Sequence, residues 1–128
     1  MKFNPLTSTV VDQSVLAEAY TTGRDIGVIK LTENYLFFRK KLKVYYIPYT
    51  DVRRCFRRVM LVPAKLCCGK GDFEIEHLVI CGDAGELAQI QLPGTRAAKI
   101  MMEELKERIP HAKFVRPDVD GEAETAEE

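Results

Sequence analysis

The chain carries four arginines within six residues: Arg53, Arg54, Arg57 and Arg58. On a strand, successive side chains point to opposite faces, so Arg53 and Arg57 share one face while Arg54 and Arg58 share the other. A bulge or a strong twist would be needed to gather all four guanidinium groups into one patch. Such a patch would bind anions, either lipid headgroups or nucleic-acid phosphates.

A second interpretation gives the same arginines a structural role. If the strands on either side of residues 60–71 are adjacent, Glu74 and Glu76 lie across from the arginines and pair with them. Both interpretations stay open at this point. The cluster lacks the aromatic residues that RNA-binding sheets place among basic ones, so we do not expect nucleic acid as a partner.

Basic residues are concentrated in the middle of the chain. Residues 39–70 hold ten Lys and Arg against one Asp, although the net charge of the whole chain is zero. Six acidic residues lie in residues 118–128, which have almost nothing to bury and are predicted to be disordered. The rest of the chain carries a net charge of about +6. We predict a basic binding face made of Lys40, Lys41, Lys43, Arg53, Arg54, Arg57, Arg58, Lys65 and Lys70.

The cysteines and histidines do not form a recognisable catalytic or metal site. Cys67 and Cys68 could join Cys81 and His77 at a metal, but adjacent cysteines lack the two-residue gap of structural zinc sites. Neighbouring basic residues would favour a thiolate at the pair, which is the one reason to consider a redox role. No Ser-His-Asp set, phosphate-binding glycine loop or carboxylate pair is visible. We therefore predict no enzyme, no metal, no cofactor and no small-molecule substrate.

The remaining polar side chains have structural explanations. His77 shares a strand face with Phe73 and Ile75, which favours a place in the core or at its rim. His111 follows Pro110 and is predicted to be solvated. Three tyrosines surround Pro48: Tyr45, Tyr46 and Tyr49. They could form an exposed aromatic contact surface, but we expect two of them to pack and one to be exposed.

The elements that position these residues are mostly strands. β-branched and aromatic runs separated by short polar turns predict a strand-rich fold. Residues 14–20 suit either a helix or a strand, and we predict a strand. Pro48 cannot donate a ladder hydrogen bond, so its strand should end, bulge or lie at an edge there. The predicted strands cover residues 14–20, 26–32, 35–40, 44–49, 52–61, 73–81 and 86–92.

A single amphipathic helix is predicted after the last strand. Thr95 is the expected N-cap, and Pro110 ends the helix. Glu104 and Arg108 form an i, i+4 ion pair. An apolar stripe at spacings of three and four would cover the sheet, closing one end of a bent sheet or barrel. The stripe consists of Ala98, Met101, Met102, Leu105 and Ile109.

Two segments resemble the bacterial pleckstrin-homology-like domains, which are related in fold to GRAM domains. Residues 27–38, GVIKLTENYLFF, are similar to a hairpin of that group, and residues 47–52, IPYTDV, resemble its step into the next strand. The resemblance covers about residues 14–110. It implies a barrel of about seven antiparallel strands in two near-orthogonal sheets capped by one C-terminal helix, used as a binding module. In phosphoinositide-binding relatives the first loop is basic, whereas residues 20–27 offer only Arg24, next to Asp25.

These observations lead to a prediction of domains and function. Residues 1–13 are expected to form an irregular arm, 14–112 the pleckstrin-homology-like domain, and 113–128 an acidic tail. No signal peptide or membrane-spanning run is visible, so we expect a cytoplasmic protein. The predicted function is a non-enzymatic module that binds a protein partner, or a second copy of itself, through its basic face. The alternative is a peripheral membrane module that binds anionic lipid headgroups.

Overall fold

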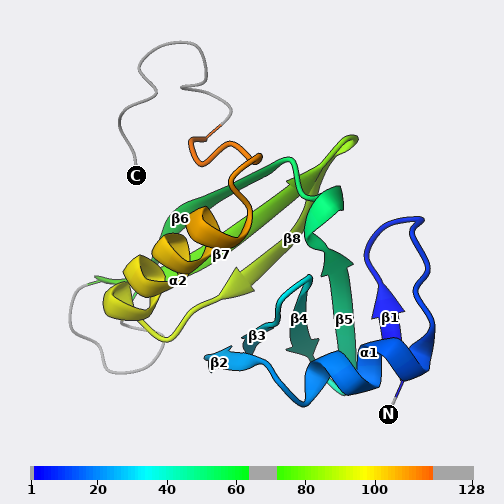
Figure 1. Cartoon of the computed structure of the whole chain (residues 1–128). Coiled ribbons are helices and arrows are strands. Elements are labelled where there is room, and N and C mark those ends of the chain that lie inside the picture. The colour runs from blue at the N-terminus through cyan, green and yellow to red at the C-terminus, as the bar shows by residue number, and fades with distance from the viewer. Residues whose placement is uncertain (1, 64–71, 117–128) are drawn as a thin grey trace.

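The chain folds into two β-sheets and a long C-terminal helix (Figure 1). The computed structural model describes residues 2–63 and 72–116. Lys65, Lys70, Cys67, Cys68 and the acidic tail from 117 onward, all part of the predictions above, lie outside the described residues.

A five-stranded sheet has the order β1-β5-β4-β3-β2, and a three-stranded sheet has the order β6-β7-β8. The strands are β1 (Phe3–Pro5), β2 (Arg24–Ile26), β3 (Ile29–Leu31), β4 (Tyr35–Lys40), β5 (Lys43–Pro48), β6 (Arg54–Pro63), β7 (Asp72–Gly82) and β8 (Gly85–Gln91). The helices are α1 (Gln13–Tyr20) and α2 (Thr95–Arg108), with a 3-10 turn η1 (Tyr49–Asp51) between β5 and β6.

The predicted mainly β architecture with two sheets and a C-terminal helix is confirmed. The finer prediction of a barrel is wrong, because within residues 2–63 and 72–116 no ladder joins one sheet to the other. This part of the chain has eight strands and two α-helices, against about seven strands and one helix predicted. None of its helices has the length and apolar character needed to cross a bilayer.

Residues 14–20, predicted as a strand, form helix α1 instead. The Asp12 carboxylate accepts a hydrogen bond from the Ser14 backbone N–H at 2.9 Å and so caps the first turn. That carboxylate also lies within reach of the Ser14 hydroxyl, and these bonds lower the Asp12 pKa. Leu16 is the residue that α1 buries. A local cap and one apolar anchor therefore override the alternating pattern of the segment.

The start of the chain, predicted as an irregular arm, contributes strand β1. β1 runs parallel to β5, with Phe3 opposite Val44, although an all-antiparallel fold was predicted. Gln13 clamps β1 to α1: the Phe3 N–H donates to the Gln13 side chain at 2.8 Å, and Gln13 donates back to the Phe3 carbonyl at 2.9 Å. Phe3 is buried in a small second core with Leu16, Phe37 and other side chains.

The strand predicted over residues 26–32 is broken at Gly27 into β2 and β3. Gly27 has a φ of +64°, in the left-handed region that favours glycine. A Cβ there would also lie 2.9 Å from the Pro93 ring. The strands around it follow the predictions closely: β4 matches residues 35–40, and β5 ends at Pro48.

Helix α2 lies along the three-stranded sheet, beside β6 and β7 (Figure 1), and its apolar side packs in a core shared by both sheets. Its predicted stripe is confirmed, since each of its five side chains is at most 6% exposed and belongs to the main core. The same core takes side chains from both sheets, among them Leu31 and Leu36 from one and Leu78 and Ile80 from the other. The two sheets therefore meet through apolar side chains that α2 covers.

Polar contacts hold both ends of α2. The N-cap is Gly94, which corrects the prediction of Thr95, and the Thr95 hydroxyl instead donates to Glu76 of β7 at 3.3 Å. At the other end, Arg108 donates to the Thr32 carbonyl at 2.9 Å and to Glu104 at 3.1 Å, which confirms the predicted i, i+4 pair. The first end thus contacts the three-stranded sheet, and the second contacts the turn between β3 and β4.

Replacing Leu105 by alanine should destabilise the protein by about 2–5 kcal/mol, because the substitution leaves a cavity where both sheets meet the helix. Chemical denaturation measures this change in the free energy of unfolding. Lys106→Ala, at the exposed neighbouring position, is the matched control and should stay within about 0.5 kcal/mol of wild type. Equal losses for the two variants would show that the helix does not hold the sheets together.

Candidate functional site

The structure divides the predicted basic face between two places. Lys40, Lys41 and Lys43 lie at the turn between β4 and β5, while the four arginines lie on or next to β6 in the other sheet. Figure 1 shows this turn near α1 and the start of the chain. The connection into β6 leaves from the opposite end of β5. The residues close in sequence therefore do not form one continuous face.

The turn between β4 and β5 presents an apolar side chain surrounded by cations. Lys40 pairs with Lys43 across the hairpin, which leaves Lys41 and Leu42 as its two turn residues. Lys41 has a φ of +59°, and Leu42 is fully exposed at 101%. Leu42 together with Lys40, Lys41 and Lys43 is called the hairpin tip below.

A shallow hollow of about 500 Å³ adjoins the hairpin tip. Strand β1 lies along β5 there, and the Asn4 amide donates to the Val44 carbonyl at 3.2 Å. The pairing brings Lys2, remote in sequence, beside the hairpin; neither Lys2 nor Arg39 was part of the predicted site. No carboxylate lines the hollow, and within the described residues none of its cations takes part in an ion pair. These cations are Lys2, Arg39, Lys41 and Lys43.

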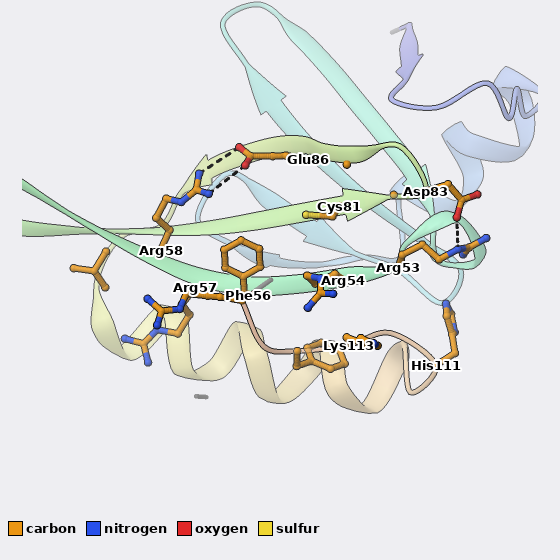
Figure 2. Close-up of a pocket in the computed structure, with 15 residues that line it drawn as sticks. Arg53, Arg54, Phe56, Arg57, Arg58, Cys81, Asp83, Glu86, His111 and Lys113 are labelled. Carbon is orange, nitrogen blue, oxygen red and sulfur yellow. Dashed lines mark hydrogen bonds and ion pairs between the residues drawn. The ribbon is translucent and has the colours of Figure 1, made fainter. Parts of the chain in front are cut away.

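The arginines line a larger groove, of about 1120 Å³, along β6 and the segment after α2 (Figure 2). This β6 groove also contains Phe56, with two carboxylates, Asp83 and Glu86. Lys113 reaches it because Arg54 and Lys113 form a parallel bridge at the edge of β6. Sequence reasoning missed Lys113 and Arg116, because only tertiary pairing carries the segment after α2 back to β6. The six cations of the groove are Arg53, Arg54, Arg57, Arg58, Lys113 and Arg116.

Two of the arginines make exposed ion pairs across the sheet. Arg53 pairs with Asp83 at 2.7 Å, and Arg58 pairs with Glu86 at 3.2 Å (Figure 2). The Arg58 guanidinium also lies 5.6 Å from the centre of the Phe56 ring. Exposed pairs of this kind contribute only up to about 1 kcal/mol, so an anionic ligand could compete with them.

Arg57 is different, because its carboxylate partner is buried. It donates to both oxygens of Glu76, at 3.1 and 2.7 Å, and Glu76 is only 4% exposed. Figure 2 shows Arg57 on the side of β6 that faces α2. The hydrogen bonds from Arg57 hold the Glu76 pKa below its usual value against the opposing effect of burial. The structural interpretation of the arginines, pairing with Glu76, is confirmed for Arg57.

The two described thiols and the His77 imidazole lie in the interior of the fold. Cys55 and Cys81 are free and buried, and burial raises the pKa of Cys55 to about 12, far from a reactive thiolate. Burial also raises the Cys81 pKa. The Nδ1 atom of His77 is buried without a hydrogen-bond partner within the described residues. In the same residues, no three His, Cys, Asp or Glu side chains could together hold a metal.

His111 is exposed, as predicted, and it also fastens the segment after α2 to the fold. Its Nε2 lies 3.1 Å from the Tyr49 carbonyl and 3.2 Å from the Val52 carbonyl. Both partners are acceptors, so this nitrogen carries the proton. Lys113 continues the attachment by bonding to the backbone of residues 53 and 55. His111 thereby helps to form one wall of the β6 groove.

The three tyrosines do not make an aromatic contact surface. Tyr46 and Tyr49 are buried, and Tyr45 stacks on Phe38 with 5.4 Å between ring centres. The Tyr49 hydroxyl donates to the Thr32 carbonyl at 2.7 Å, and burial raises its pKa to about 12. Two of the three pack fully, as predicted, and the third is half-buried.

No family model, curated protein or solved structure matches the chain.

Arg57→Ala should destabilise the fold by about 3–5 kcal/mol, because it leaves the Glu76 carboxylate buried without its main partner. Arg53→Ala, which removes the same side-chain type from an exposed pair, should cost less than about 1 kcal/mol. Urea denaturation of both variants measures the difference. A loss at Arg57 no larger than that at Arg53 would show that the buried pair contributes little.

The low pKa of Glu76 predicts a pH-dependent stability. The unfolded chain, with Glu at its ordinary pKa of 4.5, binds a proton more readily than the folded protein does. The stabilisation is therefore complete above pH 4.5 and is lost as pH falls through the lower pKa of the folded state. The difference in unfolding free energy between wild type and Glu76→Gln should shrink over that acidic range. Glu103→Gln, on the exposed side of α2, is the control; a constant difference for Glu76→Gln would contradict the assignment.

Proposed function

We propose that this chain is a non-enzymatic binding module whose hairpin tip docks reversibly on an anionic membrane surface. The observation that carries the proposal is Leu42, which is fully exposed at 101% among lysines that have no carboxylate beside them within residues 2–63 and 72–116. An exposed leucine at a tight turn adds nothing to the core, yet it is positioned to enter an apolar phase ahead of the rest of the domain.

The composition of the hairpin tip suits a bilayer interface. Burying one leucine side chain contributes about 1.5–3 kcal/mol, and each lysine or arginine near an anionic surface contributes about 1 kcal/mol. Stable anchoring generally needs two such signals, one apolar and one electrostatic, and the hairpin tip provides both. As a cytoplasmic protein, the chain would meet the leaflet that carries anionic lipid.

The β6 groove supports this function less well than the hairpin tip does. Its arginines make contacts within the molecule, and Arg57 is committed to a buried carboxylate. The four cations of the hollow have no such partners in the described part of the chain. Binding of a protein partner, the first function predicted from sequence, stays a prediction, and so does self-association.

The relationship to pleckstrin-homology-like domains is part of this proposal. The succession of a first sheet, a second sheet of β6, β7 and β8, and a C-terminal helix supports it. The parallel β1 and helix α1 are additions to the expected pattern. Since β1 brings Lys2 to the hollow, one of these additions contributes directly to the proposed membrane surface.

Vesicle flotation tests the proposed function. The protein should float with vesicles of phosphatidylcholine and phosphatidylserine at low salt, and it should not float with phosphatidylcholine alone. Binding should fall steeply at about 1 M salt, where the Debye length is about 3 Å. Leu42→Ser should lower the bound fraction on anionic vesicles about tenfold, through loss of the apolar contribution.

Val10→Ser is the matched control, because Val10 is also exposed, at 77%, but does not line the hollow. It should bind vesicles like wild type. Lys41→Gln and Lys99→Gln form a second pair with equal charge change, of which only the first should weaken binding. Retention of full binding by both Leu42→Ser and Lys41→Gln would reject the hairpin tip as the membrane contact.

A further inference from the structure

Another hollow lies where the end of β8 meets the turn between β2 and β3 and the end of β4. Its volume is about 490 Å³. A Cβ on Gly27 would lie 2.9 Å from the Pro93 ring, so this turn and the segment after β8 are in close contact. The Arg39 N–H donates to the Val28 carbonyl at 3.1 Å and joins the turn to β4. This hollow is called the β8 cleft, and it is lined by residues 27–28, 38–40 and 89–93.

The floor of the β8 cleft is apolar. Phe38, Ile90 and Leu92 line it and belong to the main core, and each is at most 4% exposed. Val28 also lines the cleft, and its side chain is 39% exposed to solvent. The volume falls within the range of small-molecule sites, about 300–1,000 Å³, which are mostly apolar with a few polar groups that orient the ligand. The cleft therefore suits a ligand with a hydrocarbon body.

The outer edge of β8 adds hydrogen-bond donors to the same cleft. The Leu92 N–H donates to the Glu76 carbonyl at 2.8 Å, so the backbone of residue 92 is directed to β7. These directions alternate along an antiparallel strand, and the register with β7 is regular over residues 88–91. The backbone groups of Gln89 and Gln91 therefore point away from β7. β8 is an edge strand in the described part of the chain, so these N–H groups have no strand beside them there.

Two cations lie beside these donors. Arg39 and Lys40 line the β8 cleft at the end of β4, and both are exposed. Within residues 2–63 and 72–116, neither side chain makes an ion pair or a hydrogen bond, and no carboxylate lines the cleft. Hydrogen bonds between a cation and an anion are about twice as strong as neutral ones. The polar side of the cleft therefore favours an anionic group.

We propose that the β8 cleft binds one molecule of a single-chain anionic amphiphile, a fatty-acid carboxylate or a monoacyl phosphate. Its chain would lie on the apolar floor, and its head would accept hydrogen bonds from Arg39 and from the outward N–H groups of β8. Arg39 also lines the hollow beside the hairpin tip, so a bilayer docked there is one source of the ligand. Binding itself does not rest on the membrane proposal. Val28 lines the cleft and not the hollow, whereas Leu42 lines the hollow and not the cleft, so either proposal can fail alone.

An NMR titration of the full chain with octanoate, without vesicles and below the micelle-forming concentration, tests the inference. The amide signals of Gln89 and Gln91 should shift, while those of Val59 and Leu61 on the other edge strand should not. Octanol, which has the same chain without the charge, should bind at least about tenfold more weakly. Octyl phosphate distinguishes the two heads, since the tighter of the two anions identifies the source as a phosphate or a carboxylate. Equal binding of octanoate and octanol, or no shift at Gln89 and Gln91, would overturn the proposal.

Two pairs of variants locate the ligand. Val28→Asp places a carboxylate in the cleft and should lower octanoate affinity at least about tenfold. Val15→Asp is its control, because Val15 is similarly exposed, at 47%, but lies on α1 outside the cleft. Arg39→Gln should weaken octanoate binding and leave octanol binding unchanged, whereas Lys99→Gln, with the same charge change, should alter neither.

Vesicle flotation of the same variants separates this inference from the membrane proposal. Val28→Asp and Val15→Asp change the charge equally, and neither residue lines the hollow, so the two variants should float alike. Leu42→Ser, which should lose vesicle binding, should still bind octanoate like wild type. Octanoate binding by Val28→Asp equal to that of Val15→Asp would reject the β8 cleft as the site, whatever the vesicles show.

Discussion

The two sheets of this fold are joined by packing rather than by hydrogen bonds between their strands, and α2 makes that packing possible. The apolar stripe of α2 enters a core to which both sheets contribute. The ends of the helix have different polar partners: Thr95 donates to Glu76 of the three-stranded sheet, and Arg108 donates to the Thr32 carbonyl in the turn between β3 and β4. Every surface discussed here is positioned by this arrangement, because it sets where β6 and the β4–β5 hairpin lie.

Basic residues that lie close together in the sequence differ in how deeply they and their partners are buried. Arg57 and Glu76 are held together where water is largely excluded, so their pairing belongs to the structure of the domain. Arg53 and Arg58 make pairs that water and salt weaken. The lysines of the hairpin tip have no carboxylate opposite them in the described part of the chain. The three groups thus differ in what an external anion would have to displace.

Local patterns in the sequence predicted a large part of the fold. The stripe of α2, the limits of β4 and the end of β5 at Pro48 follow from periodicity and from proline chemistry. Residues 14–20 were misassigned because a single capping side chain, Asp12, decides between helix and strand there. At the break, Gly27 has a positive φ and lies where a Cβ would approach Pro93, a neighbour that is remote in sequence.

The candidate site was less predictable, because it also depends on contacts between residues that are remote in sequence. The lysines of the hairpin tip and the arginines of β6 were identified, but as one face, since charge counts along a chain carry no information on distance. Lys2 belongs to the hollow because β1 pairs with β5, and Lys113 belongs to the β6 groove because it bridges to Arg54. No local sequence pattern encodes either pairing. The sequence placed Leu42 in the turn between the strands predicted over residues 35–40 and 44–49, but a turn assignment does not say whether an apolar side chain packs on the sheet or is exposed.

The central functional claim is that the hairpin tip, and not the arginine cluster, meets an anionic membrane. Hydrogen exchange of the full chain with and without phosphatidylserine vesicles measures this directly. The account predicts slower exchange in residues 2–4 and 39–44, with residues 53–58 unchanged. Protection confined to residues 53–58, with the hairpin tip unaffected, would contradict it.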